Sequence, residues 1–169
     1  MSKTDTPTWS AAGHPLWLET VNQEGSYFNL QAVVPLDEES LIAHACQTTG
    51  LSDFGDDAWR EPFSVLVKAL EDEAQLTLMG RHMARNEIIL WLSTRLQVTA
   101  TLNANPEILA EEIKAPMVIV GLPRSGTSIL FELLAQDPDV GVPLTWEAMM
   151  PCPSPEQATY DSDPRIAVA

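Results

Sequence analysis

Gly121-Leu-Pro-Arg-Ser-Gly-Thr-Ser128 is the most informative stretch of this sequence, because of the segments on either side of it. A short, wholly apolar run, Met117–Val120, precedes it, and apolar residues at helical spacing follow it in Ile129–Leu134. An apolar run without alternation is typical of a strand buried on both faces in a parallel sheet. A strand that leads through a glycine loop into a helix gathers backbone N–H groups at the positive end of the helix dipole. The sequence therefore predicts an anion-binding loop between a strand and a helix.

The spacing within this loop narrows the chemistry of its ligand. Gly121, four residues, Gly126 and then Thr127 match the spacing of the nucleotide phosphate loop, but Thr127 stands where that motif has a lysine. A phosphate-loop NTPase uses the lysine on the β- and γ-phosphates, so its absence argues against an NTPase. Arg124 supplies a cation two residues before the second glycine instead. The loop predicts a small anionic ligand whose charge Arg124 neutralises.

Helical spacing dominates the chain before the loop. Asp37 can cap a helix that ends at Gly50, and apolar residues then recur at helical spacing twice within residues 58–98. Gly80 lies between these two patterns, so it either separates two helices or lies inside one. The sequence predicts a helical region over residues 36–115.

Three regions are expected along the chain, with an α/β fold class. Residues 1–35 lack a sustained period and are expected to form an irregular arm before the helical region. Residues 116–169 are expected to hold the first strand, loop and helix of a P-loop-like parallel-sheet domain, with a second short strand at Val140–Leu144. A capped helix start at Asp163-Pro164 is cut off soon afterwards. Because an open sheet needs several strands to cover its helices, the domain is expected to be truncated.

Composition disfavours several classes of function. The chain has 24 acidic and 9 basic residues, and its formal charge of −15 repels nucleic acids and anionic membranes. No apolar run approaches the roughly 18 residues of a membrane span, and the first residues do not resemble a signal peptide, so a cytoplasmic protein is predicted. Cys46 and Cys152 lack metal-type spacing, and free thiols are expected. No metal site is predicted.

Several segments together resemble one enzyme family. Pro123-Arg-Ser-Gly-Thr-Ser128 resembles the 5′-phosphosulfate-binding loop of the sulfotransferases, in the arginine-bearing form common in bacterial members. Further segments are similar to the large bacterial group that carries a helical region before its nucleotide domain: Leu51–Gly55, Arg81–Arg95, Leu133–Pro138, Thr145–Glu147 and Ala158–Ile166. The resemblance covers about residues 40–169.

The resemblance implies sulfuryl transfer from 3′-phosphoadenosine 5′-phosphosulfate (PAPS) to a hydroxyl or amine of a small-molecule, glycan or lipid acceptor, without a required metal. It also implies a set of donor-binding residues: Pro123, Arg124, Ser125, Gly126, Thr127 and Ser128. The N–H groups of Ser125, Gly126, Thr127 and Ser128 would hold the 5′-phosphate, and the last two would add their hydroxyls. Arg124 would stabilise the developing charge. The family holds the 3′-phosphate further downstream, and no such site follows in this chain. The chain alone is therefore expected to bind the donor weakly and to turn over nothing.

Transfer to a hydroxyl also needs a group that accepts the proton of the acceptor. Glu147 is the carboxylate best placed in the sequence, within a proline-rich stretch, 145–155, that is expected to be a loop. Glu147 is predicted to be catalytic together with Arg124, and a structural or substrate-orienting role or plain solvent exposure stays open. Tyr160 and Asp161 lie in another similar segment, where packing is their expected role.

Two other classes of function stay open. One is a P-loop nucleotide-binding kinase or NTPase, against which the missing lysine argues. The other is a non-catalytic helical interaction module that retains the loop as a relic. Preference for 3′,5′-bisphosphorylated adenosine would indicate the sulfotransferase, magnesium-dependent ATP binding would indicate the NTPase, and binding of neither would indicate the module.

Overall fold

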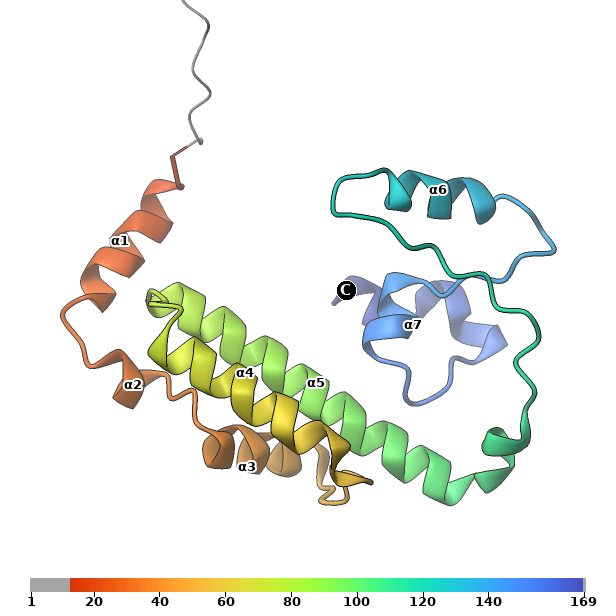
Figure 1. Ribbon diagram of the computed structural model, residues 1–169, viewed down its shortest axis with the longest axis horizontal. Coiled ribbons are helices and arrows are strands. Elements are labelled where there is room, and N and C mark those ends of the chain that lie inside the picture. Colours follow the sequence, from red (N-terminus) through yellow and green to blue (C-terminus); the bar gives the residue numbers. More distant parts are fainter. Residues whose placement is uncertain (1–12, 169) are drawn as a thin grey trace, which may run out of the picture. The chain divides into compact units, whose positions relative to one another are not determined.

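A computed structural model describes residues 13–168, in which helices are the only regular secondary structure (Figure 1). No helix in this described part combines the length and apolar composition needed to cross a membrane. In chain order the elements, with η marking a 3₁₀-helix, are α1 (Leu16–Gly25), α2 (Leu30–Val33), α3 (Glu38–Thr49), η1 (Asp57–Trp59), α4 (Arg60–Asp72), α5 (Leu78–Ala104), η2 (Pro106–Ala110), α6 (Thr127–Leu134), α7 (Thr145–Met149), η3 (Gln157–Ser162) and η4 (Pro164–Ala167).

The chain divides into two compact units that do not follow the order of the sequence. The first consists of residues up to 44 together with 58–89, and the second consists of residues 45–57 together with those from 90 onwards. The loop and the other candidate site residues all belong to the second unit. The domain boundary expected at residue 116 stays a prediction.

Apolar packing among α3, α4 and the first part of α5 holds the first unit together. Leu41 of α3, Phe63 and Val67 of α4, and Ile88 of α5 are all buried. In this unit α4 lies beside the first part of α5 (Figure 1). Full burial of one such side chain contributes about 1.5–3 kcal/mol, so these four residues account for a substantial part of the packing energy.

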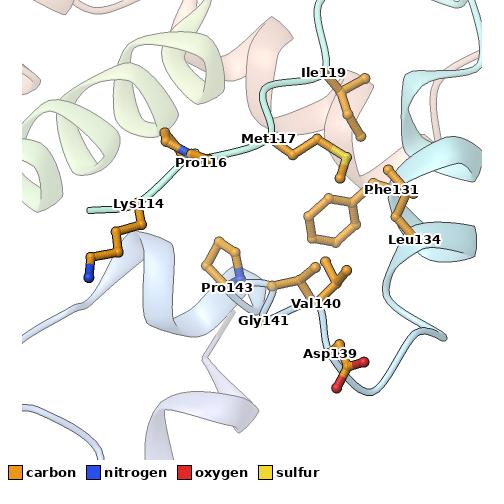
Figure 2. A pocket seen from close by; sticks show the side chains of 12 residues that line it. Lys114, Pro116, Met117, Ile119, Phe131, Leu134, Asp139, Val140, Gly141 and Pro143 are labelled. Atoms are coloured by element: carbon orange, nitrogen blue, oxygen red, sulfur yellow. The ribbon is translucent and has the colours of Figure 1, made fainter. Parts of the chain in front are cut away.

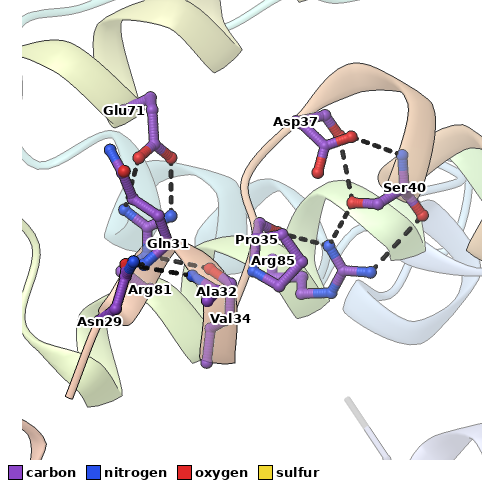
Figure 3. Close-up of polar contacts among 10 residues, drawn as sticks. All are labelled: Asn29, Gln31, Ala32, Val34, Pro35, Asp37, Ser40, Glu71, Arg81 and Arg85. Carbon is purple, nitrogen blue, oxygen red and sulfur yellow. Dashed lines mark hydrogen bonds and ion pairs between the residues drawn. The ribbon is translucent and has the colours of Figure 1, made fainter.

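A buried arginine connects the end of α2 to α4 and α5 (Figure 3). Arg81 is only 4% exposed, and its Nε donates to the carbonyl oxygen of Val34 at 2.9 Å. Its two terminal nitrogens donate to the carboxylate oxygens of Glu71 at 3.2 and 2.6 Å. These hydrogen bonds are the main cause that lowers the pKa of Glu71. Because a buried charge without partners is strongly destabilising, this pairing makes the burial of Arg81 tolerable.

The helix predicted between Asp37 and Gly50 is confirmed as α3. The N–H of Ser40 donates to Asp37 Oδ1 at 2.8 Å, which is the expected N-cap (Figure 3), and it is the main cause that lowers the pKa of Asp37. Gly50 adopts φ +70°, the left-handed conformation that ends many helices. Gly80 lies inside α5, and the chain between α4 and α5 instead breaks where Gln75 takes φ +47°.

The irregular arm predicted for residues 1–35 is wrong for the part that contains α1 and α2. Pro15 sits immediately before α1 with φ −55°, and its carbonyl accepts from the first turn of that helix. The Asn29 side chain caps α2 by accepting from the N–H groups of Gln31 and Ala32. Pro15 and Asn29 therefore start helices in this part of the chain. The expected arm at residues 1–12 lies outside the described residues.

The two predicted strands are absent from the described residues, so the start of a parallel sheet is not seen. Neither Met117–Val120 nor Val140–Leu144 has regular secondary structure, and Val118 and Val120 are 75% and 88% exposed. A strand exists only through hydrogen bonds to a neighbouring strand, whereas a helix bonds within itself. Among the described residues no such ladder of hydrogen bonds forms with either run, so both remain irregular.

Candidate functional site

The glycine loop folds back on itself before α6. The N–H of Ser125 donates to the carbonyl oxygen of Leu122 at 3.1 Å, which closes a turn. A Cβ added to Gly121 would lie 2.6 Å from Ser125 Oγ and 2.9 Å from Thr127 Cγ2, so a larger residue there would require these two side chains to move. Gly126, the N-cap of α6, adopts φ +92°, a conformation that favours glycine. The backbone conformation therefore favours glycine at 126, and two neighbouring side chains leave little space for a larger residue at 121.

The start of α6 presents unpaired donors. The N–H groups of Gly126, Thr127 and Ser128 donate to no acceptor within residues 13–168. Arg124 has an exposed side chain and forms no ion pair or hydrogen bond with the described residues. Its backbone is left-handed, with φ +64°, which is uncommon for a residue with a side chain. Free N–H groups and a cation at a helix start form a binding site suited to an anion.

Glu147 lies in the helix α7, where the sequence predicted a loop. The prolines around α7 mark its borders, and a helix of five residues is too short to show a periodic pattern. Glu147 is the third residue of this helix, and its Oε2 accepts from the N–H of Leu144 at 2.7 Å. Its Oε1 accepts from the hydroxyl of Tyr160 at 3.0 Å. Glu147 is half-buried, so its carboxylate is held in place rather than freely solvated.

Trp146, the neighbour of Glu147, is enclosed by residues of η3 and η4. Trp146 is 4% exposed, and the ring of Tyr160 packs against it at a centroid distance of 5.4 Å. The guanidinium of Arg165 lies 4.7 Å from the centroid of the same ring, at the distance of a cation–π contact. Arg165 also donates to the carbonyl oxygens of Met150 and Pro153, both at 2.7 Å. The segments 145–147 and 158–166 thus form one packed cluster.

Asp163 fixes Arg165 in this cluster and starts η4, as the capped helix start in the sequence predicted. Asp163 Oδ1 accepts from the N–H and from Nε of Arg165, both at 2.9 Å, and Oδ2 accepts from Nη2 at 2.6 Å. The side-chain hydrogen bonds with Arg165 lower the pKa of Asp163 to about 2 and raise that of Arg165. The pair keeps the guanidinium oriented toward Trp146.

The comparisons with known proteins agree on one family. Residues 116–167 match the family model described as the sulfotransferase family. Two solved structures each match 78% of this chain with a TM-score of 0.70: sulfotransferase STF9 from Mycobacterium avium at 32% identity and sulfotransferase STF1 from Mycobacterium tuberculosis H37Rv at 35% identity.

This chain belongs to the sulfotransferase family. It spans about a third of the length of these solved sulfotransferases, since the matches cover 33% of STF9 and 37% of STF1. A comparison with curated proteins found no match.

Within the sulfotransferase segment, the described residues place Arg124 and Glu147 in separate environments. No hydrogen bond or ion pair connects them among residues 13–168, and the partners of Glu147 come from the 3₁₀ segment η3 and from the start of α7. Those described residues also contain no group of three or more His, Cys, Asp or Glu that could hold a metal ion. The catalytic roles of Arg124 and Glu147 and the donor-binding role of residues 123–128 stay predictions.

A cavity of about 330 Å³ is lined by the segment before the loop, by α6 and by residues 139–143 (Figure 2). Met117, Phe131, Val140 and Pro143 converge on it in Figure 2, and the remaining lining includes Ile119 and Leu134. Lys114 and Asp139 also line the cavity, so its wall is partly polar. None of residues 121–128 lines this cavity.

Sequence reasoning missed Tyr160 and Arg165 as neighbours of Glu147. The similarity of residues 158–166 to a family segment singled out this stretch, but it did not predict that Tyr160 contacts Glu147. Tyr160 lies 13 residues after Glu147, and the two belong to separate short helices, η3 and α7, so no period relates them. The available signal for this contact was that an aromatic residue adjoins each acidic one, in Trp146-Glu147 and in Tyr160-Asp161.

Proposed function

We propose that the protein is a sulfotransferase that transfers the sulfuryl group of PAPS to an acceptor hydroxyl or amine, and that residues 123–128 bind the 5′-phosphate of the donor. One arrangement carries the proposal: three N–H groups at the start of α6 and the Arg124 guanidinium lack partners within residues 13–168. Backbone donors at a helix start together with a cation suit a phosphate. The family match supports the choice of a sulfated nucleotide.

The loop residues have distinct proposed roles. Gly126, Thr127 and Ser128 donate backbone N–H groups to the phosphate, and the hydroxyls of Thr127 and Ser128 add further hydrogen bonds. Pro123 and Ser125 shape the turn, because the Ser125 N–H is already bonded to a carbonyl oxygen of the loop. PAPS, when bound, supplies an activated sulfuryl group whose leaving group is the nucleotide phosphate.

Arg124 and Glu147 would act on the two sides of the transferred group. Glu147 accepts the proton as the acceptor oxygen or nitrogen forms its bond to sulfur. The bond from sulfur to the bridging oxygen breaks, and its electron pair goes to the departing 3′-phosphoadenosine 5′-phosphate. Arg124 and the N–H groups at the start of α6 stabilise that added charge, much as in phosphoryl transfer. Arg124 stays charged throughout, because its pKa is too high for proton transfer at neutral pH.

The fold proposed for the sulfotransferase domain is a P-loop-like parallel sheet in which Met117–Val120 is a strand. The exposure of Val118 and Val120 supports this, since an apolar run of this kind is stable only when covered on both faces. The solved relatives are also more than twice as long as this chain, because matches that span 78% of this chain cover only 33% and 37% of theirs. The acceptor class proposed is a small molecule, a glycan or a lipid, and the cytoplasmic location stays a prediction.

The experiment that tests this function is an NMR titration of the ¹⁵N-labelled chain with 3′-phosphoadenosine 5′-phosphate, which detects weak binding residue by residue. The expected result is that the amide signals of Gly126, Thr127 and Ser128 shift most. Arg124→Ala is expected to weaken binding about tenfold or more, because a hydrogen bond to a charged group contributes about 1.5–3 kcal/mol. Lys114→Ala removes an exposed cation outside the loop and is expected to change the affinity little.

The alternatives predict different results in the same titration. Shifts caused by ATP only in the presence of magnesium would indicate a kinase or NTPase, and the absence of shifts with either nucleotide would indicate an interaction module. An equal loss in Lys114→Ala and Arg124→Ala would show that net charge, rather than the loop, determines binding. Sulfotransfer by the full-length protein then tests the reaction itself.

A further inference from the structure

We propose that Tyr160 is a positioning residue for Glu147: its hydroxyl fixes the plane of the Glu147 carboxylate so that the carboxylate can accept a proton from the acceptor. This inference rests on the proposed function, in which Glu147 is the proton acceptor. Tyr160 acts through Glu147, since its recorded hydroxyl contact is to that carboxylate.

Two donors from different parts of the chain hold the two oxygens of this carboxylate. The N–H of Leu144 reaches Oε2 at 2.7 Å, and the hydroxyl of Tyr160 reaches Oε1 at 3.0 Å. Two bonds to different oxygens prevent rotation about the last side-chain torsion, which is otherwise broad for glutamate. Each carboxylate oxygen accepts more than one hydrogen bond, so a site on each remains for an acceptor hydroxyl. The carboxylate is therefore both oriented and available.

Tyr160 can orient Glu147 because its own ring is held. The ring packs against Trp146 with an interplanar angle of 60°, an edge-to-face type of contact that stabilises aromatic pairs. Trp146 is buried and carries the Arg165 guanidinium near its ring. Arg165 is in turn bonded to Asp163 through three hydrogen bonds. The phenol thus sits at the end of a chain of fixed contacts.

The charge state of Tyr160 suits a donor. Burial is the largest cause that raises the pKa of its phenol, and the hydrogen bond with Glu147 raises that pKa further. The phenol therefore stays protonated at neutral pH and keeps donating to the carboxylate. It also keeps its proton when Glu147 ionises, which excludes Tyr160 as the proton acceptor at that pH.

The kinetic experiment is a double-mutant cycle in the full-length protein with Tyr160→Phe and Glu147→Gln. Tyr160→Phe keeps the ring and its contact with Trp146 but removes the hydroxyl. It is expected to lower kcat about tenfold or more through misplacement of the carboxylate, with the KM for PAPS unchanged. Because the two residues act as a unit, the double variant is expected to be no slower than Glu147→Gln alone.

Tyr27→Phe is the matched control, because Tyr27 is 80% exposed and belongs to the first unit. It is expected to leave kcat and KM unchanged. Losses that multiply in the double variant, or a raised KM for PAPS in Tyr160→Phe, would assign Tyr160 a general structural role and overturn the inference.

A titration separates this inference from the proposed function. The chain has 2 tyrosines, so in Tyr27→Phe the ultraviolet titration reports Tyr160 alone. Adding Glu147→Gln is expected to lower the pKa of Tyr160, because the carboxylate no longer opposes phenolate formation. An unchanged Tyr160 titration refutes the contact itself. Absence of sulfotransfer in the full-length protein, with the titration shift present, refutes the proposed function and leaves Tyr160 bound to Glu147.

Discussion

At the scale of single residues, Gly121 is the loop position with the least space. A methyl group there would lie 2.6 Å from Ser125 Oγ and 2.9 Å from Thr127 Cγ2, both inside the normal contact distance. Gly121→Ala is therefore expected to push the Ser125 and Thr127 side chains out of their places in the loop and to weaken binding of 3′-phosphoadenosine 5′-phosphate about tenfold, or about 1.4 kcal/mol. The NMR titration of the chain measures this loss.

Gly141→Ala provides a control for the same substitution in the same unit. A methyl group at Gly141 would meet nothing within 4 Å, and its φ is not positive. Its affinity for the nucleotide is expected to equal that of the unchanged chain. Equal affinities for Gly121→Ala and the unchanged chain would mean that the close approach at Gly121 does not shape the binding loop.

The Asp163–Arg165 pair gives a second prediction at this scale, concerning pH. Arg165 lowers the pKa of Asp163 from 3.8 to about 2, so the folded state binds this proton less tightly than the unfolded state. A depressed pKa contributes stability that is complete above the unfolded value and is lost as the pH falls through the folded value. The stability advantage of the unchanged chain over Asp163→Asn is expected to be constant above about pH 5 and to vanish between about pH 4 and pH 2.

Urea unfolding of both proteins across this pH range measures the advantage as a difference in free energy of unfolding. Asp161→Asn is the control, since the Asp161 side chain is exposed and forms no hydrogen bond or ion pair with the described residues. It is expected to follow the unchanged chain at every pH. A difference for Asp163→Asn that persists at pH 2 would show that the pair stabilises through packing rather than through its charge.

At the scale of elements, the sequence predicted the helix whose capping and terminating residues lie within or next to it. The helix α3 was predictable because Asp37 caps it and Gly50 ends it, and both residues act locally. The helix α7 was missed, because its five residues are too short for a period and its stability comes from packing of Trp146 against Tyr160 and Arg165. Local signals find helix ends, while short packed helices depend on distant residues.

The predicted strands fail for a related reason. Met117–Val120 has the composition of a buried strand. An apolar composition indicates that the run is stable when buried, but it does not identify the strand with which the run would pair. Each ladder hydrogen bond requires a second segment in register. Among residues 13–168 no segment pairs with this run in a ladder, so the element that the sequence indicates does not form there.

At the scale of the whole molecule, one part of the candidate site could be predicted from the sequence and the other part could not. The loop around Arg124 was predictable, because a spacing of glycines and hydroxyls along the chain defines it and its ligands are its own backbone groups. The surroundings of Glu147 were not predictable, because Tyr160 reaches it across a turn that no periodic pattern describes. Site features made by contiguous residues can be found in a sequence, and those made by packing cannot.

The second unit exposes large apolar side chains on the segment around the loop: Met117, Val118, Val120, Leu122, Ile129 and Leu133 are each at least 64% exposed. Soluble monomers rarely leave extended apolar patches uncovered. If this segment belongs inside a parallel sheet, as proposed, the chain studied alone is expected to bind a hydrophobic fluorescent dye and to self-associate. Val120→Thr is expected to reduce that dye binding, because it removes apolar surface where no packing is lost.

The same substitution separates an exposed surface from a covered one. In the full-length protein Val120→Thr is expected to lower the melting temperature by several degrees, since a buried hydroxyl without a partner costs about 1–3 kcal/mol. Val65→Thr, at a valine 64% exposed on α4, is expected to have little effect in either form. If Val120→Thr leaves the melting temperature of the full-length protein unchanged, Val120 stays in water there and Met117–Val120 is not an interior strand. Val120→Thr is thus expected to have opposite effects in the two forms: it lowers dye binding by this chain and destabilises the full-length protein. This combination is expected only if further sequence buries Met117–Val120.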